Sequence, residues 1–228
     1  MMNFKNVFYR CTFAWRSTRW AGLRKHVFVL LLLGLCSVRA FAADTLLILG
    51  DSLSAGYQMP VANAWPTLLN TQWQTQKKGI AVVNASISGD TAAQGLARLP
   101  ALLEQHQPRW VLIELGGNDG LRGFPVPTIE QNLAQIITLV KQANAQPLLM
   151  QIRLPPNYGR RYIESFSNLY PKLAEQFALP LLPFFMEQVY LKPEWMKEDG
   201  IHPTRDAQPF IAEWMAKQLE PLVNHESE

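Results

Sequence analysis

Cysteine is almost absent from this sequence of 228 residues, which contains only Cys11 and Cys36. The region from residue 43 onward therefore forms no disulfide and has no thiol nucleophile. That excludes a cysteine hydrolase and fits an oxidising compartment. The sequence also lacks an H-E-x-x-H, a P-loop and a G-x-G-x-x-G motif. These absences argue against a metalloprotease, an NTPase and a dinucleotide-binding enzyme.

Histidine is scarce in the same region, where only His106, His202 and His225 occur. Three scattered histidines without any cysteine do not make a zinc site, and we expect neither a metal nor an organic cofactor. His106 follows a helical pattern and precedes Gln-Pro, which reads as a helix end, where the helix dipole favours a histidine. His225 lies in the polar tail. Only His202 lies in a turn-rich segment with a carboxylate nearby.

Acidic residues are missing from residues 1–42, which carry seven Lys or Arg residues. The apolar run over residues 27–36 is too short for a stable membrane anchor, because spanning a bilayer takes roughly 20 residues. An Ala-Phe-Ala tripeptide ending at Ala42 has the small-x-small pattern of a leader-peptidase site. We therefore predict a signal peptide over residues 1–42 and a periplasmic protein. Lipidation of Cys36 is the alternative, which the bulky Leu35 before it disfavours.

Without these residues the charge balance changes sign. The whole chain has a formal net charge of +3, but seven of its 21 basic residues lie in the leader, which leaves 14 against 18 acidic ones, or −4. This negative net charge gives no argument for nucleic-acid binding, which we do not expect. Residues 43–228 suit one domain with one core, and we expect a monomer without stable membrane insertion.

Short apolar runs alternate with segments of helical periodicity along residues 43–228. This alternation predicts an α/β fold, in which a parallel sheet is covered by helices on both faces. Thr128 is expected to cap the third of the long helices. The expected strands cover residues 45–49, 80–83, 110–115, 147–152 and 181–184, and the expected helices cover residues 64–73, a segment from 91, 128–143, 162–177, 186–191 and 207–219.

Ser52 follows the first expected strand, in Gly50-Asp51-Ser52. Ligands bind at the carboxyl ends of strands in open α/β sheets, and a serine there can act as a nucleophile if a base and an oxyanion site converge on it. Alternatively, Asp51 and Ser52 only cap the next helix. Ser54 is a poorer candidate because it is farther from the strand end. It also stands where the G-x-S-x-G elbow of an α/β-hydrolase needs glycine.

A general base for Ser52 is available in Asp199-Gly200-Ile201-His202. In a tight loop the Asp199 carboxylate reaches the Nδ1 atom of His202, which leaves Nε2 to accept the proton of Ser52. The alternative is an aspartate that only caps a turn beside a surface histidine. Asp119 and Asp206 are rival carboxylates for the same place.

The oxyanion of an acyl-transfer reaction needs preorganised donors. Gly89 follows the second expected strand, and its N–H has no side chain beside it to block the tetrahedral carbon. The amide of Asn118, after the third strand, adds a second donor, and the N–H of Ser52 a third. Gly89 could equally be a turn glycine, and Asn118 could belong to an Asx-turn.

Together these segments resemble the SGNH (GDSL) hydrolase family over essentially all of residues 43–228. The resemblance implies a flavodoxin-like, three-layer α/β/α fold with a five-stranded parallel sheet. It also implies Ser52 as nucleophile, Asp199 and His202 as the other triad members, and Ser52, Gly89 and Asn118 in the oxyanion hole. The matching blocks are Gly50-Asp51-Ser52-Leu53-Ser54, Ser88-Gly89-Asp90, Gly116-Gly117-Asn118-Asp119 and Asp199-Gly200-Ile201-His202-Pro203.

The resemblance implies a secreted serine hydrolase for small-molecule acyl esters and thioesters, such as lysophospholipids and acyl-CoA. Carbohydrate deacetylases also occur in the family, and a non-catalytic periplasmic binding module is a third hypothesis. Four apolar residues near the expected site are candidates for an acyl groove, although they could merely anchor loops. These are Leu121, Phe124, Pro125 and Ile152.

Overall fold

The computed structural model describes residues 43–223. The predicted signal peptide over residues 1–42 lies outside the described residues, as do residues 224–228. The elements in chain order are β1 (Asp44–Gly50), α2 (Ser52–Ala55), η1 (Val61–Asn63), α3 (Trp65–Thr75), β2 (Ile80–Asn84), α4 (Ala92–His106), β3 (Trp110–Glu114), α5 (Gly117–Leu121), α6 (Val126–Gln142), β4 (Gln146–Met150), η2 (Pro156–Tyr158), α7 (Arg160–Phe177), β5 (Leu181–Leu182), α8 (Met186–Val189), η3 (Pro193–Trp195), η4 (Arg205–Ala207) and α9 (Gln208–Val223).

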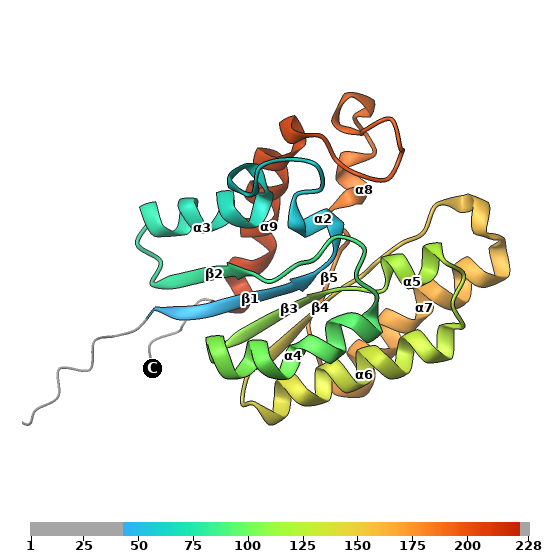
Figure 1. Cartoon of the computed structure of the whole chain (residues 1–228), viewed down its shortest axis with the longest axis horizontal. Helices are drawn as coiled ribbons and strands as arrows, with labels where there is room; N and C mark the ends of the chain where they lie inside the picture. Colours follow the sequence, from blue (N-terminus) through green and yellow to red (C-terminus); the bar gives the residue numbers. More distant parts are fainter. Residues whose placement is uncertain (1–42, 224–228) are drawn as a thin grey trace, which may run out of the picture. The chain divides into compact units, whose positions relative to one another are not determined.

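The five strands form one parallel sheet in the order β2-β1-β3-β4-β5 (Figure 1). Strand β1 lies between β2 and β3, and its residues Leu46 to Leu49 are fully buried. A strand that is buried on both faces needs an unbroken apolar run, which is the pattern from which the sequence predicted it. The predicted α/β class with a five-stranded parallel sheet is confirmed.

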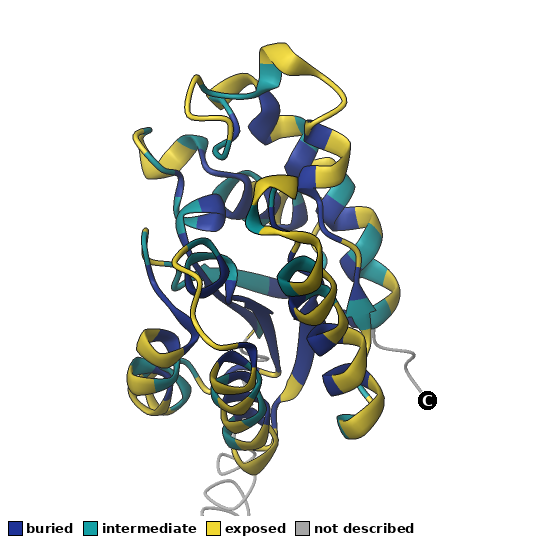
Figure 2. Ribbon diagram, turned by 90° about the vertical axis from the view of Figure 1, so that its right-hand side faces the viewer, coloured by how far each residue is buried: buried dark blue, intermediate teal, exposed yellow. Residues whose placement is uncertain are grey.

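Helices cover both faces of the sheet. α3 and α9 pack together on one face, and α4, α6 and α7 lie in a row on the other (Figure 1). Their sheet-facing sides are buried and their outer sides exposed (Figure 2). Helix α6 shows the helical spacing that produces this division; its buried residues are Val126, Ile129, Leu133, Ile136, Ile137 and Val140.

Several boundaries differ from those expected. Helix α6 begins at Val126 with Pro125 at its N-cap, so Thr128 lies inside the first turn and the predicted cap is wrong. Proline suits this end because its missing N–H would have no helical partner there. Strand β5 contains only Leu181 and Leu182, because Pro183 cannot donate to a ladder. Short helix α5 lies outside the helices expected from the sequence.

The strand order reverses at β1, whose two neighbours β2 and β3 follow it in the sequence. At such a reversal the loops after adjacent strands turn to opposite faces, which opens a crevice at the carboxyl edge of the sheet. Ser52 follows β1 and Asn118 follows β3 at this edge. The topology therefore brings together two segments that are far apart in sequence.

Candidate active site

Ser52 is the first residue of α2, directly after β1. Asp51 is the N-cap of this short helix, and its Oδ1 atom accepts a hydrogen bond from the N–H of Leu53 at 3.1 Å. The capping role considered for Asp51 is therefore real. It leaves the Ser52 hydroxyl free to point elsewhere, and its Oγ atom lies 2.8 Å from Nε2 of His202.

His202 and Asp199 occupy the loop between η3 and η4. The Nδ1 atom of His202 lies 2.8 Å from Oδ2 of Asp199. The other carboxylate oxygen, Oδ1, accepts hydrogen bonds of 2.9 Å from the N–H groups of Ile201 and His202. Burial is slight and acts to raise the pKa of Asp199, but these hydrogen bonds lower it to about 2. The carboxylate is thus ionised beside the imidazole.

The rival carboxylates lie elsewhere. Asp119 accepts a hydrogen bond of 2.8 Å from the N–H of Ala92, so it ties α5 to the start of α4. Asp206 belongs to η4 and lies 3.8 Å from the guanidinium of its neighbour Arg205. Neither is the carboxylate that contacts His202.

A buried glutamate supports the turn that carries Ser52. The Oε2 atom of Glu114, at the end of β3, accepts hydrogen bonds from the Ser54 hydroxyl at 2.7 Å and from the N–H of Asp51 at 3.3 Å. It thus holds the residues on either side of Ser52. Gly50 makes this approach possible, because a Cβ atom there would lie 2.6 Å from Oε2. The Ser54 hydroxyl is fully buried and donates to Glu114, whereas that of Ser52 contacts His202.

Burial raises the pKa of both carboxyl groups under this turn. The pKa of Asp51 is raised to about 7 by burial, with the charges of Asp90 and Asp119 acting in the same direction. The pKa of Glu114 lies well above its usual range because the side chain is buried and faces Asp51. Two anions this close and this deeply buried repel each other, so the pair favours a protonated state.

Asn118 is the second residue of α5. Its Nδ2 atom donates to Oδ2 of Asp51 at 3.1 Å and to the carbonyl of Asp90 at 3.0 Å. Both N–H groups of the amide therefore have acceptors, and Asn118 can donate to an oxyanion only by giving up or sharing one of them. Gly89 is adjacent to Asp90, with φ of 86° in the left-handed region that favours glycine.

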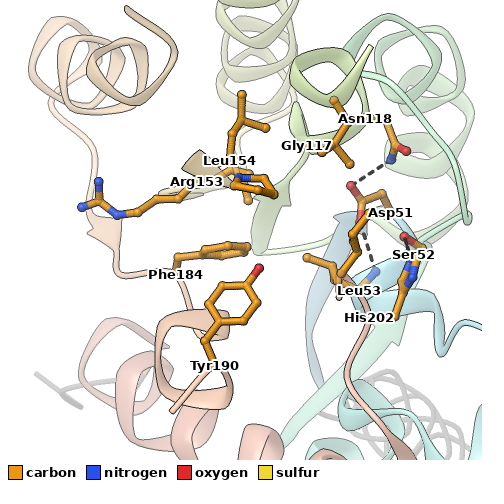
Figure 3. A pocket seen from close by; sticks show the side chains of 14 residues that line it. Asp51, Ser52, Leu53, Gly117, Asn118, Arg153, Leu154, Phe184, Tyr190 and His202 are labelled. Atoms are coloured by element: carbon orange, nitrogen blue, oxygen red, sulfur yellow. Dashed lines mark hydrogen bonds between the residues drawn. The ribbon is translucent and has the colours of Figure 1, made fainter. Parts of the chain in front are cut away.

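A cavity of about 180 Å³ lies between Ser52, Asn118 and His202 and the segments that follow β4 and β5 (Figure 3), and Gly89 does not line it. Of the four candidate acyl-groove residues, Leu121 and Ile152 line this cavity. Phe124 and Pro125 do not line it. Both follow a turn after α5, in which the N–H of Phe124 donates to the carbonyl of Asp119 at 3.0 Å. The Phe124 side chain is exposed, and Pro125 lines a different hollow.

Sequence reasoning missed the cavity wall that faces Ser52 and His202. Leu154, Phe184 and Tyr190 form this wall, while the guanidinium of Arg153 points away from Ser52 (Figure 3). Arg153 and Leu154 follow β4, and Phe184 follows β5. Their position after the carboxyl ends of strands was a usable signal, the same one that identified Ser52.

Within residues 43–223, no cluster of three or more His, Cys, Asp or Glu side chains is arranged to hold a metal ion. The helices of this part of the chain include none with the length and apolar character needed to span a membrane.

The sequence is similar to a known protein family and to named proteins. A sequence model of the GDSL-like Lipase/Acylhydrolase family matches residues 48–208. The chain is 67% identical over 227 residues to Thioesterase 1/protease 1/lysophospholipase L1 of Escherichia coli (strain K12), with 100% of both chains covered. It is 55% identical over 183 residues to Arylesterase of Vibrio mimicus, with 80% of this chain and 92% of that protein covered.

A solved structure is similar over the same region. It is that of the psychrotrophic esterase EstA from Pseudoalteromonas sp., inhibited by monoethylphosphonate. The TM-score is 0.78 at 42% sequence identity, and the match covers 80% of this chain and 100% of that chain.

Proposed function

The chain belongs to the GDSL-like Lipase/Acylhydrolase family, and we propose that it cleaves acyl thioesters and carboxylic esters with Ser52 as the nucleophile. The family resemblance and the hydrolase class predicted from the sequence are confirmed by the comparisons, whose relatives are named as esterases and a thioesterase. The observation that carries the proposal is the chain of two 2.8 Å contacts from Ser52 Oγ through His202 to Asp199.

Acylation begins when Ser52 Oγ attacks the carbonyl carbon of the substrate and His202 Nε2 accepts the hydroxyl proton. A C–O bond forms, and the carbonyl electron pair moves onto the oxygen. When the tetrahedral intermediate collapses, the thiolate or alkoxide leaves with the proton from His202. Asp199 stays ionised through this step because its pKa is about 2. It holds the Nδ1–H tautomer and stabilises the imidazolium.

Deacylation repeats these steps with water. A water molecule gives a proton to His202 Nε2 while its oxygen attacks the acyl carbon, and Ser52 Oγ then leaves and recovers the proton. The N–H groups of Ser52 and Gly89 and the amide of Asn118 are the proposed donors to the oxyanion. Asn118 has to give up or share its hydrogen bond to Asp51 or to the Asp90 carbonyl to take this role, because its two N–H groups now donate to them.

The cavity supports an acyl chain as the bound group, because its wall of Leu121, Ile152, Leu154 and Phe184 is apolar. Ligand sites usually enclose about 300–1,000 Å³, more than the 180 Å³ beside Ser52. A second hollow of about 410 Å³ shares Leu154 and Tyr190 with it. We propose that an acyl chain longer than acetyl extends from the first hollow toward the second.

Turnover of chromogenic p-nitrophenyl esters from acetate to palmitate tests this proposal. We expect kcat/KM to rise with chain length beyond acetate, and the Ser52→Ala variant to be inactive. Turnover of the acetate ester alone would favour the deacetylase hypothesis. An inactive wild-type protein, correctly folded, would leave only a binding module.

We also propose that the protein is exported to the periplasm with cleavage after Ala42. Its support is the basic, acid-free leader with a short apolar run and a small-x-small site. The intact mass of the exported protein should correspond to a chain that starts at Ala43 and carries no lipid. A lipidated Cys36 would contradict it.

A further inference from the structure

The imidazole of His202 lies against an aromatic ring that has no part in the chemistry described so far. The rings of Tyr57 and His202 are stacked, with their centroids 4.0 Å apart and an angle of 23° between their planes. Tyr57 follows the short helix that begins at Ser52, and its N–H donates to the carbonyl of Ser52 at 3.4 Å. The stacked ring is therefore attached to the backbone of the proposed nucleophile.

The contacts within the histidine loop fix the shape of that loop but not its distance from Ser52. Asp199 binds the imidazole and two N–H groups of the same loop. The loop is also closed by a bridge between Met196 and Pro203. The tip of the loop, residues 198–200, is exposed, and a loop held mainly by its own hydrogen bonds can shift as a unit. Something outside it has to set the Ser52–His202 distance.

Lys197 supplies a second connection between the two sides. Its Nζ atom donates to the carbonyl of Tyr57 at 2.7 Å and lies 5.0 Å from the centroid of the Tyr57 ring. Its own N–H donates to the carbonyl of His202 at 2.9 Å. One side chain thus ties the histidine loop to the segment that follows Ser52.

We propose that Tyr57 and Lys197 are positioning residues for His202, the first as a flat platform under the imidazole and the second as the tie that holds this platform to the loop. The inference rests on the proposed function, because it concerns the alignment of His202 Nε2 with Ser52 Oγ. Catalysis is sensitive to such alignment, since a proton acceptor displaced by about 1 Å can cost on the order of 10²-fold in rate.

The ring of Tyr57 carries this role, and its hydroxyl does not. The hydroxyl accepts a hydrogen bond from the exposed side chain of Gln58, the next residue, at 3.2 Å. That contact leads away from His202. Phenylalanine therefore keeps the platform, whereas leucine removes the flat face and keeps an apolar side chain of moderate size.

The test compares kcat and KM of Tyr57→Phe, Tyr57→Leu and Lys197→Met on a p-nitrophenyl ester, with the rate of phosphonate labelling of Ser52 as a second readout. We expect Tyr57→Leu to lower kcat and the labelling rate about tenfold without raising KM, and Tyr57→Phe to stay within about twofold. Lys197→Met should lower both about threefold. Lys192→Met is the matched control. Its ammonium group also lies over an aromatic ring, but that ring is Trp195, at 3.8 Å, and not Tyr57.

Three results would overturn the proposal. They are an unchanged kcat in Tyr57→Leu, an equal loss in Tyr57→Phe, and an increase confined to KM, which would make Tyr57 a substrate-binding residue. If Tyr57→Leu does not fold, Lys197→Met against Lys192→Met decides the question. Failure of the proposed function has a different signature, since the wild-type protein would then be inactive or Ser52→Ala would keep its activity.

Discussion

The two sides of the candidate site are held in opposite ways. On the nucleophile side, Glu114 is fully buried and reaches Asp51 from 63 positions away in the sequence. On the histidine side, the Asp199 side chain is 37% exposed and contacts His202 only three positions away. Burial raises the pKa of Asp51 and Glu114, whereas local hydrogen bonds lower that of Asp199. Carboxyl groups of one enzyme thus take opposite charge states according to their surroundings.

This difference matches what each side has to do. The nucleophile side needs a fixed turn, which buried hydrogen bonds across the core provide. In the proposed mechanism the histidine side needs an anion beside a developing imidazolium, which the Asp199 carboxylate provides because its hydrogen bonds outweigh the effect of burial on its pKa. The stack of Tyr57 on His202 joins the two.

The contrast between the two sides of the site is tested most strongly by substituting Ser52 and Ser54, which lie two positions apart. Ser52→Ala should lower kcat by roughly 10⁴-fold or more and abolish fluorophosphonate labelling while leaving the melting temperature unchanged. Ser54→Ala should keep the labelling but destabilise the fold by about 1–3 kcal/mol, because Glu114 would lose a buried donor. Labelling that survives in Ser52→Ala and disappears in Ser54→Ala would reverse the two roles.

A smaller effect is expected at Asn118, where the nucleophile side meets the oxyanion. Loss of one oxyanion donor typically costs about 10²–10³ in kcat, so Asn118→Ala should lower kcat far more than it raises KM. Steady-state kinetics on a p-nitrophenyl ester measures both. A change confined to KM would mean that Asn118 binds the substrate in its ground state and does not stabilise the transition state.

The sequence predicted the fold because its strands are continuous apolar runs, and it predicted the meeting of Asp199 with His202 because that contact is local. Their catalytic roles stay predictions. Glu114 was hidden in an apolar run, since its partners Asp51 and Ser54 are distant in sequence and its function depends on burial. Long-range contacts of this kind leave no periodic signal in one sequence.

Helix α5 was missed for another reason. Glycine is unfavourable in helices, and Gly-Gly-Asn-Asp-Gly therefore predicted a loop. In the structure Gly116 takes φ of 107° at the N-cap, and the hydroxyl of Tyr170 donates to the carbonyl of Leu115 at 3.0 Å. Tertiary contacts thus select a helical turn that propensity opposes. Leu121, the last residue of this helix, lines the cavity, whereas Phe124 beyond it does not.

Leu121 and Phe124 test the acyl groove beside the nucleophile side, because Leu121 lines the cavity and Phe124 does not. A buried methylene contributes roughly 0.8 kcal/mol, so Leu121→Ala should lower kcat/KM about tenfold for long acyl esters and little for acetate. Phe124→Ala is the matched control and should leave the chain-length profile unchanged. The measurement is kcat/KM across acyl chains of two to sixteen carbons. An equal loss at every length in Leu121→Ala would indicate damage to neighbouring Asn118 and not loss of an acyl contact.

The smallest effect concerns stability and the buried carboxyls of the nucleophile side. A carboxyl whose pKa is raised on folding stabilises the folded state fully below its unfolded pKa, and this contribution is lost as the pH rises through the folded pKa. The pH range over which this contribution is lost runs from 3.8 to about 7 for Asp51. For Glu114 it starts at 4.5 and extends well above that pH. The unfolding free energy should therefore fall from about pH 4 to 7 through both groups, and above pH 7 through Glu114, by at most ~1.4 kcal/mol per pH unit for each proton.

Glu114→Gln isolates one of these protons. The glutamine keeps an oxygen that can accept from Ser54 and Asp51 but no longer titrates. The melting temperature of this variant should therefore fall less steeply with pH than that of the wild type, where each kcal/mol of lost unfolding free energy corresponds to about 2–4 °C. Glu213→Gln is the matched control. Glu213 is exposed and paired with Lys217, and this contact lowers the pKa of Glu213, whereas the pKa of Glu114 is raised. Thermal unfolding of the three proteins from pH 5 to 8 measures the slopes. Parallel slopes for the wild type and Glu114→Gln would mean that Glu114 is already ionised in the folded protein. The nucleophile side would then hold a true buried anion, and its contrast with the Asp199 side would lie in burial alone and not in charge.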